Sequence, residues 1–176
     1  MALQTKTLAS DPTSNGFTIK LALSEESIST TGNESDVDWE LILTSGGWNF
    51  STYHVGWDVS LAGKQVSYCS RADSPQISLA KNSSITIAKG TTTVPHNSDG
   101  SLDMAVSASI DMARASYTPG PMSLSGSMAL TQINRGLVRI DNGSNHAEYG
   151  AHIEDGTEFH LYAPYIDNGT GWDMCN

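Results

Sequence analysis

The sequence predicts an all-β protein: an antiparallel β-sandwich followed by a small region of β-hairpin repeats. Three observations support this fold class. Apolar and polar side chains alternate along most of the first 134 residues. Charged residues make up 16% and hydrophobic residues 38% of the chain, and the remainder is rich in Ser, Thr, Asn and Gly, which favour strands and turns. A thirteen-residue repeat occupies the C-terminal part.

In the first region, residues 1–134, the alternation has a period of two, which is typical of half-buried antiparallel strands. The apolar positions are, in chain order, Phe17, Ile19, Leu21 and Leu23; Val37, Trp39, Leu41 and Leu43; Val55, Trp57, Val59 and Leu61; Val66 and Tyr68; Ile85 and Ile87; Leu102, Met104, Val106, Ala108 and Ile110; and Met122, Leu124, Gly126, Met128 and Leu130. Seven or more such strands predict two packed sheets, and the pattern fits immunoglobulin-like and jelly-roll topologies equally. A turn is expected at residues 62–64.

The second region, residues 135–176, begins after the short linker 134–136. The motif Ile-acidic-Asn/Asp-Gly-Ser/Thr starts at Ile140 and recurs thirteen residues later at Ile153 and again at Ile166. Asn-Gly and Asp-Gly favour the positive φ angles of a type I′ turn, so each repeat is predicted to be a β-hairpin. Because so thin a unit buries little apolar surface, we expect it to pack on the sandwich, another copy or a partner.

The net charge of −10 and the pI of about 4.6 argue against two classes of partner. The nine Lys and Arg residues are scattered, so neither nucleic acid nor an anionic membrane surface is an expected partner. No apolar run approaches the roughly 20 residues of a membrane span, and the N-terminus lacks the apolar segment of a secretory signal. Cys69 and Cys175 lie far apart, and we expect both to be free thiols.

No catalytic motif is present, so no enzyme activity, cofactor or metal is expected. Asp141, Glu154 and Asp167 could be imagined as a glycosidase pair, but all three precede an Asn/Asp-Gly turn, and one structural role explains them together. The segment 96–101, His-Asn-Ser-Asp-Gly-Ser, only loosely resembles a calcium loop. It predicts a tight hairpin turn instead.

Aromatic side chains are the candidate binding residues. Trp39 and Trp57 fall on apolar strand faces and are expected in the core. The candidates for glycan binding or an interface are Trp48 and Tyr53 in the first region and Phe159, Tyr162, Tyr165 and Trp172 in the second. Such residues stack on sugar rings or anchor protein interfaces. Two alternatives stay open: the Trp48 cluster could belong to the core, and the others could form a small core of the repeats.

Two stretches of the chain resemble a known family. Residues 93–101, a following Ser/Ala-rich strand and residues 125–135 resemble a siphophage family of tail and minor structural proteins, whose members read like HNxDGS…SGSxxLTxIxR. Ile133-Asn134-Arg135 stands where the family usually has Ile-Pro-Arg. The hairpin repeats are similar to those at the ends of phage tail and adhesion proteins.

The resemblance implies a virion protein of the tail or a surface fibre, assembled in the host cytoplasm and exposed on the particle. It implies other virion proteins as partners, a homo-oligomer, and attachment to the host, with cell-wall glycan as a further partner. It transfers no catalytic residue. A carbohydrate-binding module without catalytic activity is the alternative, and an enzyme such as a glycan depolymerase is a third class, disfavoured by the missing motifs.

Overall fold

The computed structural model describes residues 3–13, 15–112 and 121–133 of the first region. In the second region it describes the six strand segments 137–141, 146–150, 152–154, 159–161, 165–167 and 172–174. Every regular element among these residues is a β-strand, which confirms the all-β prediction. No helix capable of crossing a membrane occurs in the described part of the chain.

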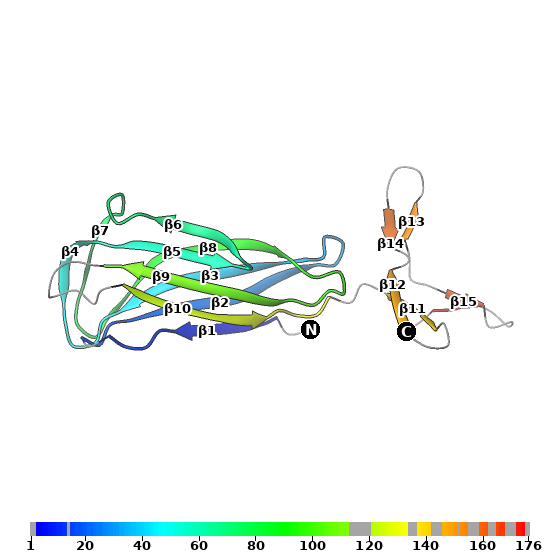
Figure 1. The fold of residues 1–176 in the computed structure, drawn as a ribbon, viewed down its shortest axis with the longest axis horizontal. Helices are drawn as coiled ribbons and strands as arrows, with labels where there is room; N and C mark the ends of the chain where they lie inside the picture. The colour runs from blue at the N-terminus through cyan, green and yellow to red at the C-terminus, as the bar shows by residue number, and fades with distance from the viewer. Residues whose placement is uncertain are drawn as a thin grey trace.

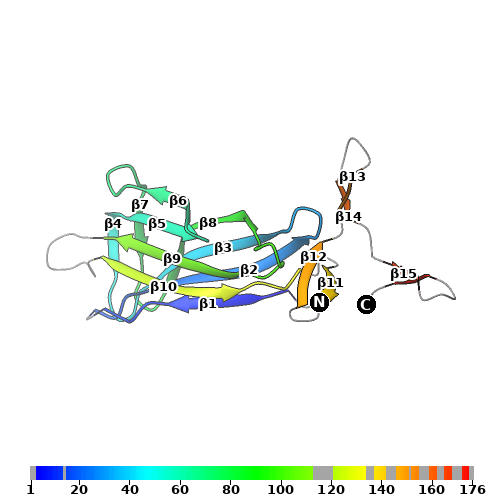
Figure 2. The same ribbon diagram turned by 45° about the vertical axis from the view of Figure 1, so that its right-hand side comes forward.

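Two four-stranded antiparallel sheets form the body of the first region and lie face to face (Figures 1 and 2). The first sheet has the order β1-β2-β3-β8, with strands β1 (Thr5–Ala9), β2 (Thr18–Ser29), β3 (Glu34–Thr44) and β8 (Ser84–Pro95). The second has the order β10-β9-β5-β6, with strands β5 (Gly56–Leu61), β6 (Lys64–Cys69), β9 (Asp103–Asp111) and β10 (Met122–Ala129). Strands β4 (Phe50–His54) and β7 (Gln76–Leu79) pair separately at one end.

The strand order is that of an immunoglobulin-type sandwich rather than a jelly roll. In that fold one sheet contains strands A, B and E, and the other has the order G-F-C-C′. Here β2-β3-β8 corresponds to A-B-E, and β10-β9-β5-β6 corresponds to G-F-C-C′. Strand β1 extends the first sheet beyond the A position, and β7, at the D position in chain order, pairs with β4 instead of β8.

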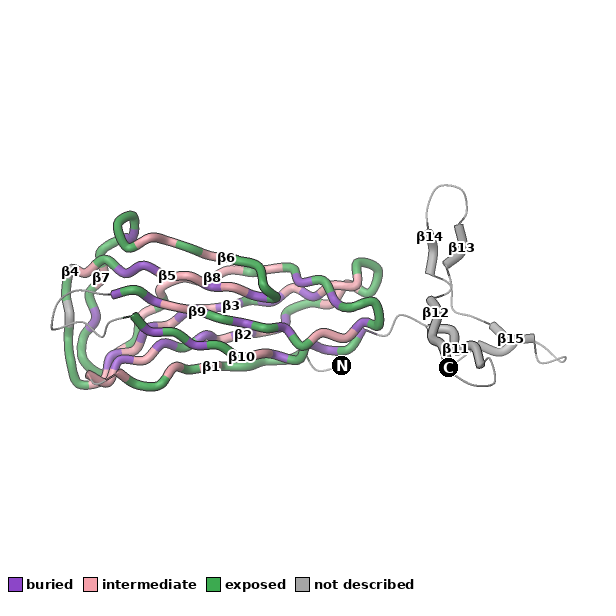
Figure 3. Tube along the Cα trace, in the orientation of Figure 1, coloured by how far each residue is buried: buried purple, intermediate pink, exposed green. Residues whose placement is uncertain are grey.

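The core lies between the two sheets and is built from the alternating positions of the strands (Figure 3). The fully buried side chains include Ile19, Leu21, Leu41, Val59 and Met104. Burying each of them stabilises the fold by about 1.5–3 kcal/mol relative to leaving it in water. The burial of these residues confirms the period-two prediction.

The two tryptophans expected in the core differ in burial. Trp39 is buried, with its indole against Gly90 of the neighbouring strand and its Nε1 donating to Thr92 Oγ1 over 3.1 Å. Trp57 is half-buried against the core, and its Nε1 donates to Ser67 Oγ over 3.0 Å. Each indole N–H thus keeps a hydrogen-bond partner.

The hairpin between β5 and β6 confirms the predicted turn. Leu61 pairs with Lys64, which leaves Ala62 and Gly63 as a two-residue loop. Their φ angles are +49° and +76°, as a type I′ turn requires at both positions.

One side of the sandwich is closed by the contact between β1 and β10. Leu8 lies directly over Gly126, where a Cβ atom would come within 3.0 Å of the leucine side chain. Lys6 Nζ donates to the backbone carbonyl of Ser127. The glycine therefore allows the two edge strands to approach.

Each repeat of the second region contains one antiparallel hairpin. The pairs are β11 (Leu137–Asp141) with β12 (His146–Gly150), β13 (His152–Glu154) with β14 (Phe159–Leu161), and β15 (Tyr165–Asp167) with β16 (Trp172–Met174). Asp141 pairs with His146, and residues 142–145 between them lie outside the described residues, so the type I′ turn stays a prediction.

Candidate functional site

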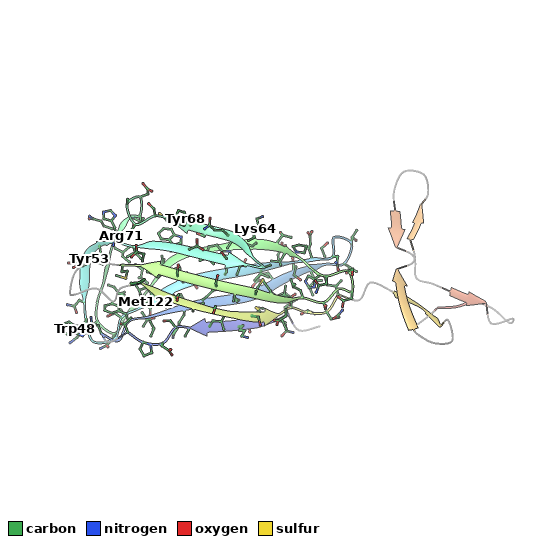
Figure 4. The ribbon with its side chains drawn as sticks, in the orientation of Figure 1. Trp48, Tyr53, Lys64, Tyr68, Arg71 and Met122 are labelled. Atoms are coloured by element: carbon green, nitrogen blue, oxygen red, sulfur yellow. The ribbon has the colours of Figure 1, made fainter. Side chains whose placement is uncertain are left out.

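Exposed aromatic side chains were the predicted binding residues, and Trp48 is the one that the structure places most clearly in solvent. It lies between β3 and β4 with 60% of its surface exposed. Figure 4 shows it with Tyr53 at the end of the sandwich where β4 and β7 pair. This is the opposite end from residues 131–133, which follow β10 and lead toward the hairpin repeats.

The backbone around Trp48 is held by the neighbouring loops. Ser45 N donates to Ser83 O over 2.9 Å, and Asn82 N donates to Gly46 O over 2.7 Å. The Ser45 hydroxyl donates to the carbonyl of Trp48 itself. A Cβ at Gly46 would lie 2.8 Å from the backbone oxygen of Gly16, so this close approach requires glycine. The loop therefore presents an apolar side chain to water from a fixed backbone.

Tyr53 and Tyr68 differ from Trp48 in position. Tyr53, on β4, is half-buried and packs against the core, so the surface it offers to a ligand is smaller. Tyr68, on β6, is 62% exposed but lies on the outer face of its sheet instead of on the loop between β3 and β4 (Figure 4). Tyr68 alternates with Val66 in the sequence, and this pattern gave no sign that its side chain faces outward.

The candidate aromatics of the repeats fall mostly on strands. Phe159 begins β14, Tyr165 begins β15 and Trp172 begins β16, while Tyr162 lies outside the described residues. The register pairs Glu154 with Phe159, and it pairs Asp167 with Trp172 in the next repeat. In these two repeats the acidic residue before the turn is therefore opposite Phe159 or Trp172. Their role as ligand-binding residues stays a prediction.

At the other end of the sandwich, a network of buried polar side chains joins three parts of the chain. Glu25 is 1% exposed and Ser35 is fully buried. Ser35 Oγ donates to Glu25 Oε1 over 2.8 Å and lies 2.9 Å from His96 Nε2. Thr131 donates to Glu25 from its hydroxyl over 2.6 Å and from its backbone N–H over 3.2 Å. Burial raises the pKa of Glu25, but these hydrogen bonds outweigh that effect and hold the pKa below 4.5.

The segment 96–101 is not the predicted hairpin turn, because β8 and β9 belong to different sheets and the segment crosses between them. It does contain a tight turn: Gly100 N donates to Asn97 O over 2.8 Å. Asp99 Oδ1 accepts hydrogen bonds from both the hydroxyl and the N–H of Ser101, which lowers the pKa of Asp99. The carboxylate thus serves the turn, the role expected of Asp in such loops.

Ser35 and His96 have the spacing of a nucleophile and its general base, but their surroundings differ from such a pair. The serine is fully buried, so its hydroxyl has no access to a substrate. The other ring nitrogen, Nδ1, lies 2.9 Å from the carbonyl of Gly100 rather than from a carboxylate. Within the described residues no three His, Cys, Asp or Glu side chains lie close enough to hold a metal ion. Cys69, the cysteine that the described residues include, is unpaired, and Cys175 lies outside them.

Glu25 and Ser35 were not among the predicted site residues, although the sequence pattern contains a signal for both. Glu25 continues the inward-facing alternation of Leu21 and Leu23, and Ser35 begins that of Val37. A polar residue at an inward position of a strand has to find a hydrogen-bond partner in the interior.

A search of the curated proteins gave no match to this chain, and a search of solved structures gave none. One family model, described as a siphovirus protein of unknown function (DUF859), matches residues 10–150. The match covers the sandwich from the approach to β2 onward and ends at the last residue of β12. The matched range includes His96, Gly100 and Thr131 of the buried polar network. Gln4, whose backbone N–H donates to Glu25, lies before that range. The chain therefore belongs to this family of siphovirus proteins.

Proposed function

We propose that this siphovirus protein is a structural component of the virion, in the tail or a surface fibre, that also contacts the host cell surface. The observation that carries the proposal is Trp48, an exposed indole on a hydrogen-bonded loop at the end of the sandwich opposite residues 131–133. One end of the domain then serves attachment to the host, and the other leads to the repeats, which serve assembly.

The physical argument for a ligand at Trp48 rests on its fixed backbone. An ordered loop loses little conformational entropy when a ligand binds, so more of the contact energy appears as affinity. An indole face stacks on the apolar face of a sugar ring. Host cell-wall glycan is therefore the ligand class that we assign to this end.

The argument for assembly rests on the hairpins. Each pair of strands forms contacts within its own repeat, and a two-stranded unit is marginally stable on its own in water. Packing against another virion protein or another copy of this chain would supply the missing partner surface. The protein is accordingly expected to be a homo-oligomer in the particle.

The test is to compare the Trp48→Ala and Tyr68→Ala variants of the full chain in binding to purified host cell walls. The two side chains are 60% and 62% exposed, so the substitutions remove similar exposed aromatic surface at different places. Trp48→Ala should weaken binding at least tenfold, which corresponds to about 1.4 kcal/mol, and Tyr68→Ala should leave it unchanged. Equal binding by both variants and the unchanged protein would refute the role of Trp48.

Phage particles carrying Trp48→Ala separate attachment from assembly. The particles should contain the normal amount of the protein and adsorb poorly to host cells. Particles that lack the protein would show that Trp48 serves assembly, contrary to the proposal.

The second candidate is a carbohydrate-binding module without catalytic activity, which the same exposed indole favours. Neither candidate requires catalysis, and we propose that the protein is not an enzyme. Incubation with host polysaccharide should therefore leave its viscosity unchanged, and a fall in viscosity would revive the enzymatic alternative.

A further inference from the structure

The segment Leu130–Ile133, which follows β10, is fastened to the sandwich along its whole length. Leu130 N donates to Leu102 O over 2.9 Å, and Ile133 N donates to Gly100 O over 2.9 Å. Between them, Thr131 donates to Glu25, and Gln132 Nε2 donates to Asp99 O over 2.6 Å. We call these four residues the strap.

Glu25 is the ionisable group through which the strap meets the interior. Its carboxylate accepts from Thr131 of the strap, from Ser35 of β3 and from the backbone N–H of Gln4, which precedes β1. One buried carboxylate therefore ties together three segments that are distant in the sequence. All of these partners are donors, and the ionised carboxylate accepts from each of them.

The hydrogens of the network can be counted. Ser35 has one hydroxyl hydrogen, and it goes to Glu25 because an ionised carboxylate only accepts. His96 Nε2 lies 2.9 Å from Ser35 Oγ, and His96 Nδ1 lies 2.9 Å from the carbonyl oxygen of Gly100.

We propose that Glu25 is a proton-sensitive latch for the strap: ionised, it fastens Leu130–Ile133 to the sandwich, and protonation releases that segment while the two sheets remain folded. A protonated carboxyl keeps fewer acceptor sites than an ionised one, so it holds the donors of Ser35, Thr131 and Gln4 less well. A buried donor left without a partner is the costly outcome of a broken hydrogen bond.

Two other titratable side chains lie near the latch. His96 contacts the network through Ser35 Oγ. Asp99, in the segment beside the strap, directs its carboxylate to Ser101. Ser35 of β3, Thr131 of the strap and Gln4 are neutral. The hydrogen bonds that hold the pKa of Glu25 below its ordinary value also fix the direction of the switch: the latch opens as the pH falls.

Release of the strap is separable from unfolding because the core does not depend on Glu25. Leu41 of β3 and Met104 of β9 are fully buried in the apolar interior, and their strands pair along their length with β2, β8, β5 and β10. Leu130 and Ile133 of the strap are buried, but local opening of this four-residue segment costs less than opening such strands.

The test is amide hydrogen exchange on the full chain between pH 6.5 and 3, expressed as protection factors so that the intrinsic rate is removed. Thr131 and Ile133 should lose at least tenfold in protection at acid pH while Leu41 keeps its protection. Glu25→Gln should show the loosened strap already at pH 6.5, because an amide offers one acceptor oxygen instead of two.

Asp36→Asn is the matched control. Asp36 is a carboxylate on β3 that also accepts two side-chain hydrogen bonds, from Thr93 and Ser27, but it makes none to the strap. This variant should keep the pH profile of the unchanged protein at Thr131 and Ile133. The latch is refuted if Leu41 loses protection together with the strap, or if Glu25→Gln keeps the unchanged profile. If Glu25→Gln fails to fold, the exchange profiles of the unchanged protein and of Ser35→Ala test the latch instead. The strap should open at a higher pH in Ser35→Ala than in the unchanged protein.

Discussion

The substitution Gly100→Ala probes the contact between the 96–101 segment and the strap. Gly100 has φ +78°, and a Cβ atom built there would lie 1.9 Å from the backbone oxygen of Ile133 and 2.9 Å from its carbonyl carbon. Real Cβ atoms essentially never come closer than 3.0 Å to another heavy atom, so the strap has to move by more than 1 Å. That movement disturbs the hydrogen bonds that Gly100 O accepts from Ile133 and His96.

The expected magnitude follows from these two effects. A left-handed backbone costs an alanine about 1–2 kcal/mol relative to glycine. Each of the two disturbed hydrogen bonds contributes about 0.5–1.5 kcal/mol. Gly100→Ala should therefore lower the free energy of unfolding by about 2–5 kcal/mol.

Gly63→Ala is the matched control, because Gly63 has nearly the same φ, +76°, and a Cβ there meets nothing within 4 Å. It should lose only the backbone contribution of about 1–2 kcal/mol. Urea unfolding followed by tryptophan fluorescence measures both variants. Equal losses for the two would refute the close approach of Gly100 to Ile133 and with it the fastening of the strap at this point.

Two further predictions concern the core and the response to acid. Leu41→Ala removes a fully buried side chain and should cost about 2–5 kcal/mol in urea unfolding; a loss below 1 kcal/mol would place Leu41 outside the core. Hydrogen bonds hold the pKa of Glu25 in the folded protein below its ordinary 4.5, so as the pH falls the unfolded chain is protonated at Glu25 before the folded one. The contribution of Glu25 to the free energy of unfolding is therefore complete above about pH 4.5, and it is lost as the pH falls through the pKa of the folded state. Urea titrations at several pH values should show this fall, and Glu25→Gln should show less of it; the same acid response in both would contradict the assignment.

The strands of the core were predictable because their pattern reflects one physical demand. Leu21, Leu41 and Met104 alternate with polar residues, since one face of each strand meets the other sheet and the opposite face meets water. Strand β1 escaped prediction because Leu8 is its one partly buried side chain, and β8 extends past Ile87 through a threonine-rich stretch without apolar alternation.

The features that were missed depend on contacts between distant segments. The hairpin expected at 96–101 was wrong because local turn chemistry does not tell whether the next strand returns to the same sheet or crosses to the other one. Similarly, Glu25 could be recognised as an inward-facing residue, but its partner Thr131 lies 106 positions away and follows from the topology alone. The immunoglobulin-type strand order is also a long-range property, which strand patterns leave open.

The register of the hairpins has a consequence for how this gene varies. Every backbone pair of β13–β14 lies inside a single repeat, as does every pair of β15–β16, so neither hairpin depends on a strand from its neighbour. A duplication or deletion of one thirteen-residue unit would therefore change the copy number without breaking any remaining pair. The family match ends with the first hairpin, at residue 150, so the two later units lie outside the matched range.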